Sequence, residues 1–260
     1  MSKICSMHQP SYLPWPPFFG KMAACDAWVH VDNVAFYNKG VQERHKIKGP
    51  NGAYWLTVPV HHSMGEPIYS IKIDTNTLRR YKHWKNIKSN YEKALYFRLY
   101  ESELYKIYNV DWEKLVDLNL ALLDFFCKHL NIHCEQYISS KLDNIPNDRN
   151  RRIIDLCKYV KADIFIAGSG GIRYMDMELF RNAGIEVIFQ LPKIKEYSQL
   201  WHRVGFIPGL STLDLLLNLG PDAEEYVKNC FELVDESTLK SRLNEVPEYN
   251  KNIDEQDDEP

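Results

Sequence analysis

Residues 3–33, KICSMHQPSYLPWPPFFGKMAACDAWVHVDN, decide the fold, because they predict a strand, a stiff loop, a helix and a second strand in succession. Residues 3–8, KICSMH, predict a short buried strand. Four prolines between positions 10 and 17 fix φ and restrict the residues before them, which keeps the loop extended. Proline is tolerated in the first turn of a helix, so a helix is expected over residues 16–26. The alternation of residues 27–33 then predicts the second strand.

An antiparallel hairpin is expected next along the chain. Residues 44–48 and 53–60 alternate like strands, and the sequence GPNG at 49–52 between them is a strong turn signal. Residues 68–74 are expected to add a further strand. Together these segments predict an antiparallel insertion after the first βαβ unit.

The rest of the chain predicts a helical segment and a second α/β half. Apolar spacings of three and four predict helices within residues 79–130, over 81–97 and 111–130. Beyond them, strands are expected over 134–142, 163–168 and 185–191. A helix is expected over 150–162, and a glycine loop followed by a helix over 169–184, ending at Gly184. Two short helices separated at Gly220-Pro221 are expected over 211–231.

These elements predict an α/β fold with a mostly parallel, Rossmann-like sheet flanked by helices, carrying the antiparallel hairpin insertion and the helical segment. No linker cleanly divides the chain, so a single domain is expected over residues 1–246, with its helical insertion at about 79–130. The acidic, apolar-poor residues 247–260 predict a disordered tail. Ligands of open parallel sheets bind at the carboxyl ends of the strands, so a site is expected at that edge.

Composition limits the classes of function. The formal net charge of −3 over 260 residues gives no general affinity for nucleic acid or an anionic membrane. No apolar stretch is long enough to span a bilayer, and the first residues lack the pattern of a secretory signal, so no membrane insertion is expected. Six cysteines without paired spacing predict reduced thiols and a cytoplasmic location. No metal is expected, because the close spacing of His129, His133 and Cys134 favours a polar helix end.

His8 and Gln9 are the first candidate site, because they follow directly on the first predicted strand. Histidine titrates near neutral pH, so His8 is a candidate general base, or a ligand to a phosphate or hydroxyl group. The alternative is a partly buried histidine that serves only the structure. The stiff proline loop favours the functional interpretation, because it holds its side chains at little entropic cost.

The glycine stretch AGSGGIRYMD, residues 167–176, is the second candidate. Small residues between a strand and a helix leave backbone N–H groups free for an anion, and Arg173 would add a bidentate phosphate contact. The alternative is a tight turn that needs glycine for geometry alone. The third candidate is the basic hairpin, which is either an anion-binding face or a solvated strand; its cationic residues are Lys39, Arg44, His45, Lys46 and Lys48.

Three blocks of the sequence resemble the WbqC-like protein family. They are HQPSYLPWPPFFGKMAACDAWVHVDNVAFYNKGVQERHKIKGPNGAYWLTVPV, AGSGGIRYMDMELFRNAGIEVIFQ and YSQLWHRVGFIPGLSTLDLLLNLGP. Two departures affect the expected loop geometry. The family usually has a small residue or proline where Ser169 and Gly170 stand, and often Pro-Tyr before the glutamine, where this chain has Glu196-Tyr197-Ser198.

The resemblance implies a set of functional positions. In this sequence they are His8, Gln9, Pro10, Tyr12, Pro14, Lys21, Asp32, Lys39, Gln42, Arg44, Lys46, Arg152, Gly168, Gly171, Tyr174, Asp176, Gln199, Phe206, Pro208, Ser211, Asp214 and Asn218. It also favours a site role for Arg44 and Lys46 over a solvated face. These blocks would have to converge at the carboxyl edge of the sheet to form one pocket.

The family resemblance implies work on an activated sugar in the synthesis of surface polysaccharides such as O-antigens. We therefore expect a transferase that attaches an acyl or aminoacyl group to the amino group of a nucleotide-linked deoxy-amino sugar. In this interpretation His8 accepts the proton of the attacking amine, and Asp32 and Asp176 orient the sugar or the histidine. The diphosphate or the developing oxyanion is held by Arg44, Lys46 and Arg173.

Two alternatives remain open at the level of sequence. One is an amide-forming enzyme that activates a carboxylate with ATP, although only His8 stands in a loop where such sites usually carry paired histidines. The other is a non-catalytic sugar-nucleotide-binding or scaffold protein of a polysaccharide assembly pathway. The expected partners are the nucleotide-linked sugar and an activated acyl donor or an aminoacyl-tRNA; the sequence leaves the cofactor and the oligomeric state open.

Overall fold

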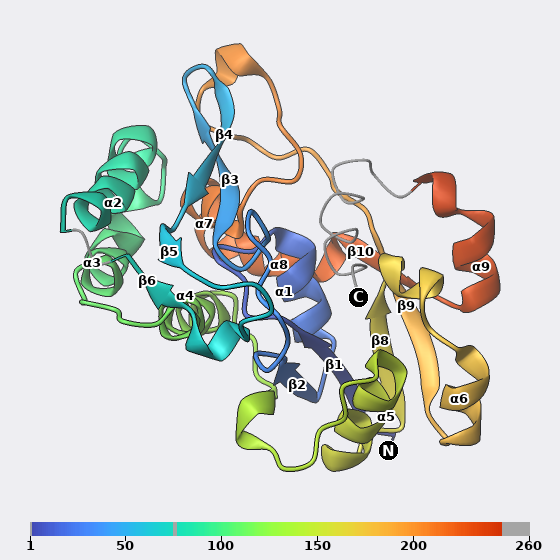
Figure 1. The fold of residues 1–260 in the computed structure, drawn as a ribbon. Helices are drawn as coiled ribbons and strands as arrows, with labels where there is room; N and C mark the ends of the chain where they lie inside the picture. Colours follow the sequence, from blue (N-terminus) through green and yellow to red (C-terminus); the bar gives the residue numbers. More distant parts are fainter. Residues whose placement is uncertain (1, 75–76, 246–260) are drawn as a thin grey trace.

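The computed structural model describes residues 2–74 and 77–245, and within them the chain builds a central sheet with helices on both faces (Figure 1). The sheet has six strands in the order β10-β9-β8-β1-β2-β7. Its strands are β1 (Ile4–His8), β2 (Ala27–His30), β7 (Glu135–Ile138), β8 (Ile164–Gly168), β9 (Glu186–Pro192) and β10 (Phe231–Val234). The first five in chain order are parallel, and β10 joins β9 antiparallel. The predicted α/β class and mostly parallel sheet are therefore confirmed. The expected tail at 247–260 lies outside the described residues.

The order of the strands places a topological switch point beside β1. From β1 the chain builds outward on one side through β2 and β7, and then crosses to the other side of β1 to form β8, β9 and β10. His8 is the last residue of β1 and Gly168 is the last residue of β8. The carboxyl ends of these two neighbouring strands thus diverge into connections on opposite faces, which opens a crevice between them.

Helices cover both faces of the sheet because the strands present apolar side chains to each. They are α1 (Pro16–Ala23), α2 (Thr77–Tyr91), α3 (Phe97–Tyr108), α4 (Leu115–His129), α5 (Arg149–Tyr159), α6 (Met177–Asn182), α7 (Thr212–Leu219), α8 (Ala223–Asn229) and α9 (Glu236–Ser241). Trp28 of β2 packs in one apolar cluster with Phe126 of α4. The next residue, Val29, points the opposite way and packs with Cys157 of α5 and Phe180 of α6.

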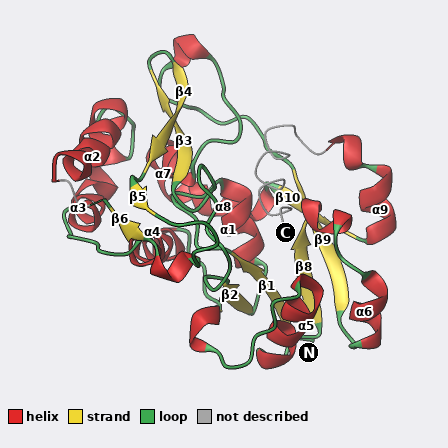
Figure 2. Ribbon diagram, viewed as in Figure 1, coloured by secondary structure: helices red, strands yellow, loops and turns green. Residues whose placement is uncertain are grey.

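The hairpin stands apart from the central sheet, as Figure 2 shows. Strands β3 (Arg44–Gly49) and β4 (Gly52–Thr57) pair antiparallel with Gly49 opposite Gly52, as the turn signal predicts. Gly52 has a φ of 116°, which a side chain would disfavour. Two short strands, β5 (Val60–His61) and β6 (Lys72–Ile73), form a second small sheet.

Several local predictions are wrong in detail. The strand expected over 134–142 ends at Ile138, where a 3-10 turn over Ser139–Lys141 follows. The helix expected over 81–97 ends at Tyr91, and α3 begins at Phe97, because the intervening turn docks its Tyr96 N–H on the carbonyl of Leu217. The strand expected over 68–74 is a 3-10 turn followed by the two residues of β6. Residue 231 was expected to end a helix, yet it begins β10, where pairing with β9 outweighs local helix preference.

Gly20 allows α1 and α8 to pack closely. A Cβ built at position 20 would overlap the carbonyl oxygen of Val227 and lie 2.8 Å from ring atoms of Phe231. We expect Gly20→Ala to lower the free energy of unfolding by about 1–3 kcal/mol, the usual cost of overpacking. Chemical denaturation of the two proteins measures the difference, and an unchanged midpoint would show that the two helices can move apart freely.

Candidate functional site

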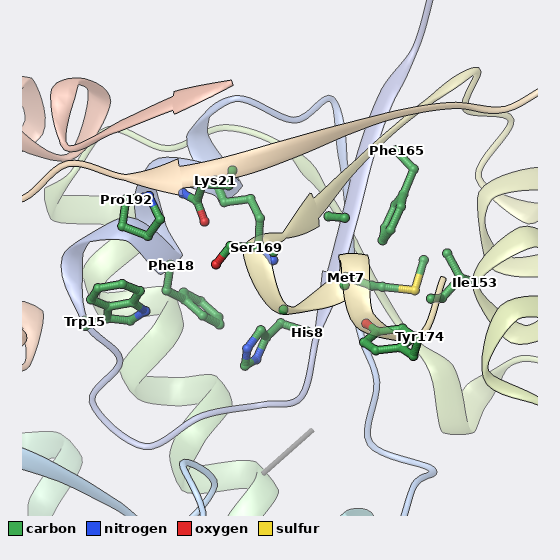
Figure 3. A pocket seen from close by; sticks show the side chains of 15 residues that line it. Met7, His8, Trp15, Phe18, Lys21, Ile153, Phe165, Ser169, Tyr174 and Pro192 are labelled. Atoms are coloured by element: carbon green, nitrogen blue, oxygen red, sulfur yellow. The ribbon is translucent and has the colours of Figure 1, made fainter. Parts of the chain in front are cut away.

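A small recess lies in the crevice between the ends of β1 and β8. Its volume is ≈ 100 Å³. Figure 3 shows its labelled side chains, with His8 near the middle, Lys21 and Ser169 on one side, and Met7 and Phe165 on the other. Residues from β1, α1, β8, β9 and the glycine turn therefore meet at the edge where the strand order predicts a ligand.

His8 is held in one tautomer by its backbone. Its Nδ1 lies 2.9 Å from the carbonyl oxygen of Gln9, which accepts only from a protonated nitrogen, so the lone pair falls on Nε2. The edge of the half-buried ring packs on Phe18 with the centroids 5.1 Å apart. Burial, followed by the nearby Lys21 ammonium, lowers the pKa of His8 to about 4. At neutral pH the imidazole is uncharged and its Nε2 can accept a proton.

Lys21 brings a cation into the recess from α1. The side chain is only 5% exposed, and its Nζ lies 5.5 Å from the ring centroid of Trp28. In Figure 3 it extends from the helix toward Ser169, above His8. Among the described residues that line the recess none carries a carboxylate. The recess is therefore suited to an anion or to an oxygen on which negative charge develops.

The glycine turn forms the wall of the recess opposite α1. Residues Ser169–Arg173 make a 3-10 turn directly after β8. A Cβ at Gly171 would lie 3.0 Å from the sulfur of Met175 and 3.3 Å from Cβ of Ala167, so a side chain there would force these neighbours to shift. At Gly168 a Cβ would meet nothing within 4 Å. Gly168 therefore borders open space, whereas Gly171 serves close packing.

A wider groove continues from the recess. It has a volume of ≈ 890 Å³ and shares Met7, His8, Ile153 and Tyr174 with the recess. Amide, phenol and guanidinium side chains line its walls, and its described lining also includes no carboxylate; the polar residues are Gln9, Asn33, Tyr37, Tyr69, Asn147, Arg149, Asn150, Arg152 and Tyr174. Such groups donate hydrogen bonds to phosphate, hydroxyl and carbonyl oxygens.

The start of α5 supplies the cationic wall of this groove. The Arg149 guanidinium lies 4.2 Å from the ring centroid of Tyr174. Arg152 donates to the carbonyl oxygens of Pro146 at 3.1 Å and Asn147 at 2.7 Å, which fixes the loop before the helix. Burial lowers the pKa of Arg152, and Arg149 adds to that effect. The two cations thus face the groove from a rigid helix start.

The structure brings together part of the expected site. His8, Lys21, Gly168, Gly171 and Tyr174 line the recess. Gln9 lines the groove, and its side-chain oxygen accepts a hydrogen bond from the amide of Gln42. Site-lining residues that sequence reasoning missed include Phe18, Asn33, Tyr69, Asn147, Arg149, Asn150 and Gln190. Only the tertiary fold shows that they line the site, although Phe18 follows directly on the proline loop.

The two aspartates proposed to orient substrate make local contacts instead. The carboxylate of Asp32 accepts from the hydroxyl of Ser140 at 2.6 Å and from its backbone N–H at 2.8 Å, and also from Ser139. These bonds join the end of β2 to the turn after β7. Asp176 caps α6 by accepting from the N–H of Glu178 at 3.0 Å. Arg173 is exposed at the end of the glycine turn.

Tyr12 and Lys39 lie outside both cavities. Tyr12 is fully buried, and its hydroxyl lies 2.8 Å from Nδ1 of His83 and 2.9 Å from the hydroxyl of Tyr108. It thereby fastens the proline loop to the helical segment. The Lys39 backbone N–H donates to Glu43, and Lys39 has a φ of 65° in a turn before the hairpin.

The side chains of Arg44 and Lys46 both lie over the aromatic ring of Trp55 in the hairpin. The Arg44 guanidinium is 4.2 Å and the Lys46 ammonium 5.0 Å from the ring centroid of Trp55, whose side chain is 44% exposed. Neither residue lines the recess or the groove. Their role in substrate binding stays a prediction, and the observed contact is a cation–π arrangement between the partly buried strand β3 and the exposed ring of Trp55 on β4.

Four further predicted residues, Lys48, Gln199, Ser211 and Asp214, belong to a buried polar clasp between the hairpin and α7. Lys48 is fully buried and donates to Gln199 at 3.0 Å and to the carbonyl of Gly205 at 2.6 Å. Asp214 accepts from the hydroxyls of Tyr91 at 2.9 Å and Tyr197 at 2.7 Å. A related contact is made by Ser211, which caps α7 and donates its backbone N–H to the Lys46 carbonyl. These residues fix the loop after β9 against the hairpin.

The clasp predicts a pH-dependent term in stability. Burial raises the pKa of Asp214 to about 6 from the ordinary 3.8. Between these values the folded carboxyl keeps a proton that the unfolded chain releases, so stability falls as the pH rises through 6. The difference in unfolding free energy between Asp214→Asn and wild type should shift in favour of the variant by up to about 3 kcal/mol between pH 4 and 7, at roughly 1.4 kcal/mol per pH unit.

Denaturation at several pH values measures this difference, with Asp155→Asn on the exposed face of α5 as the control. A shift of equal size in the control, or none in Asp214→Asn, would contradict the assignment to the clasp.

Comparisons with known proteins place the chain in a family. Residues 9–226 match the WbqC-like protein family. The chain is also 29% identical over 239 residues to a Mycobacterium tuberculosis protein described as uncharacterized protein Rv1507c, covering 88% of this chain and 99% of that one. No solved structure matches. Within residues 2–74 and 77–245, no helix is long and apolar enough to cross a membrane.

Proposed function

Because the chain belongs to the WbqC-like protein family, we propose that it transfers an acyl or aminoacyl group to the amino group of a nucleotide-linked deoxy-amino sugar, for surface polysaccharide synthesis. One observation carries this proposal. The uncharged His8 presents an unprotonated Nε2 where a small cationic recess opens into a groove large enough for a nucleotide sugar. This arrangement would place a general base next to a site for an oxyanion and a site for a large polar substrate.

The groove supports the nucleotide-sugar half of the proposal. Its volume of ≈ 890 Å³ is within the range of about 300–1,000 Å³ that ligand sites occupy. Arg149 offers a guanidinium for the diphosphate, and Asn33 offers amide N–H groups for hydroxyl or base edges. Tyr37 and Tyr69 offer phenol rings that can pack on a sugar or base. The amino group of the sugar would then reach His8 at the mouth of the recess.

The proposed reaction is nucleophilic substitution at the acyl carbon of an activated ester or thioester. The amine nitrogen forms a bond to that carbon, and the bond from the carbon to the leaving oxygen or sulfur breaks. His8 Nε2 takes the proton that the amine loses and returns it to the leaving group. The Lys21 ammonium stabilises the oxygen that carries negative charge in between. An aminoacyl-tRNA is an ester of this class and remains a candidate donor.

A second candidate function is ATP-dependent activation of a carboxylate. It is favoured by the glycine turn and Lys21, which meet at the switch point where doubly wound sheets place nucleotides. In that reaction the carboxylate oxygen bonds to the α-phosphorus, pyrophosphate leaves, and the amine then displaces adenosine monophosphate from the acyl-adenylate. Exchange of labelled pyrophosphate into ATP in the presence of a carboxylic acid distinguishes it from direct transfer.

Substitution of the two central residues tests the transferase. His8→Gln should lower kcat about a hundredfold to ten-thousandfold, the usual contribution of a general base, with binding of the nucleotide sugar retained. Lys21→Met keeps the apolar stem and should lower kcat by about a hundredfold or more. The assay follows acylated sugar nucleotide by mass spectrometry, across UDP- and dTDP-linked amino sugars and a panel of activated donors.

The matched control is His133→Ala, because His133 is exposed and outside both cavities. Full activity of His8→Gln would refute the base. Absence of product from wild type with every sugar and donor would refute the transferase.

The low pKa of His8 can be measured without a substrate. The imidazole stays uncharged until the pH falls to about 4, so its ring signals in NMR spectra, assigned by comparison with His8→Gln, should move only toward pH 4. An ordinary histidine would titrate near pH 6.5. Circular dichroism at each pH verifies the fold, and a midpoint between 6 and 7 would show that the surroundings do not keep this imidazole uncharged.

A further inference from the structure

We infer that the recess selects the transferred group, and that it admits a short, uncharged acyl group of the acetyl class while it excludes bulky acyl groups and aminoacyl groups. The inference rests on the proposed function for the fate of the acyl group. Its binding step can be measured without any turnover. It narrows the donor from any acyl or aminoacyl compound to a short aliphatic one.

The size of the recess limits the group. Protein cavities of roughly 150 Å³ accommodate one benzene molecule. On that scale a recess of ≈ 100 Å³ has room for about four non-hydrogen atoms. An acetyl group fits within this volume and an aromatic acyl group exceeds it. The nucleotide sugar is also too large for the recess and would bind in the groove.

The walls have a polar side and an apolar side. Lys21 and Ser169 lie on one side of His8, and Met7, Phe165 and Ile153 lie on the other (Figure 3). Phe165 and Ile153 belong to the buried apolar cluster under the sheet, so this side cannot easily widen. A short acyl group matches the arrangement, with its oxygen toward Lys21 and its methyl group toward Met7 and Phe165.

The charge of the recess disfavours an aminoacyl group. An α-ammonium would lie within a few ångströms of the Lys21 ammonium in a partly buried space, and like charges at such distances repel strongly. The described lining offers no carboxylate to compensate it. Turned away from Lys21, the ammonium would meet the apolar side chains of Met7 and Phe165, where it would lose part of its hydration.

Gly168 offers a direct way to reduce the volume. Its φ of −68° and ψ of 161° suit any residue, and a Cβ there would meet nothing within 4 Å. Gly168→Ala therefore adds a methyl group to the open space without strain, and Gly168→Val fills more of it. Gly171→Ala would disturb Met175 and is unsuitable for this purpose.

Binding of three carboxylates to the full chain at pH 7 tests the inference. Acetate, glycine and benzoate are titrated while NMR follows the ring signals of His8, assigned by comparison with His8→Gln. We expect acetate to shift these signals, with glycine and benzoate at least tenfold weaker. Gly168→Ala should weaken acetate about tenfold, the lower bound for one methylene in a tight pocket. Gly168→Val and Lys21→Met should abolish the shift.

Several results would overturn the inference. They are no shift with acetate, comparable binding of glycine or benzoate, or undiminished acetate binding by Gly168→Val. Melting curves of the Gly168 variants verify that a lost shift is not lost folding. Failure of the proposed function gives a different result, because selective acetate binding would persist while no donor yields product. Conversely, transfer from aromatic or aminoacyl donors would support the function and refute the selection.

A substitution that enlarges the recess tests selection by size independently. Met7→Ala removes a side chain from the apolar side of the recess and should extend binding from acetate to butyrate. The bound chain would occupy the space that the thioether leaves. Unchanged discrimination between acetate and butyrate in this variant would show that Met7 does not limit the recess and would count against selection by size.

Discussion

Parallel pairing of β1 on both of its edges is the interaction on which the rest of the structure depends. Cys5 aligns with Ala27 of β2 on one side and with Phe165 of β8 on the other. The two partners come from opposite halves of the chain, so this one strand joins the halves. Because the connections leave β1 and β8 on opposite faces, their ends part, and His8 and Gly168 border the resulting recess. The chemistry of the site follows from that geometry.

The proline loop after β1 is fixed by contacts with distant segments. The side chain of Asn119 in α4 donates to the carbonyls of Pro10 and Gln42, and Gln42 in turn holds Gln9. Tyr12 is anchored by His83. Loop, hairpin and helical segment therefore form one rigid support for His8, and the Lys48–Asp214 clasp secures the far side of the hairpin. A preorganised base needs such a support, since its position must not relax during proton transfer.

Sequence patterns correctly predicted the turns and helix ends that depend on the backbone preferences of neighbouring residues. Proline in the first turn of α1, the glycine turn of the hairpin and Gly184 after α6 follow from backbone preferences, and all three were found where expected. Side-chain roles depended on partners remote in sequence. Asp32 carries the residue type of a catalytic acid, yet Ser139 and Ser140 engage its carboxylate. Arg149 gave no signal, because only the crossing from β7 to β8 brings α5 beside the end of β1.

The double pairing of β1 also bears on how the chain emerges from a ribosome. One edge of β1 can pair with β2 as soon as residue 30 is available, but the other waits for residues 164–168. At translation rates of about 5–20 residues per second, that edge stays without its partner for roughly 8–30 seconds. An apolar strand with an open edge is prone to pair with other chains. Nascent molecules of this protein therefore carry an open strand edge until the second half is synthesised.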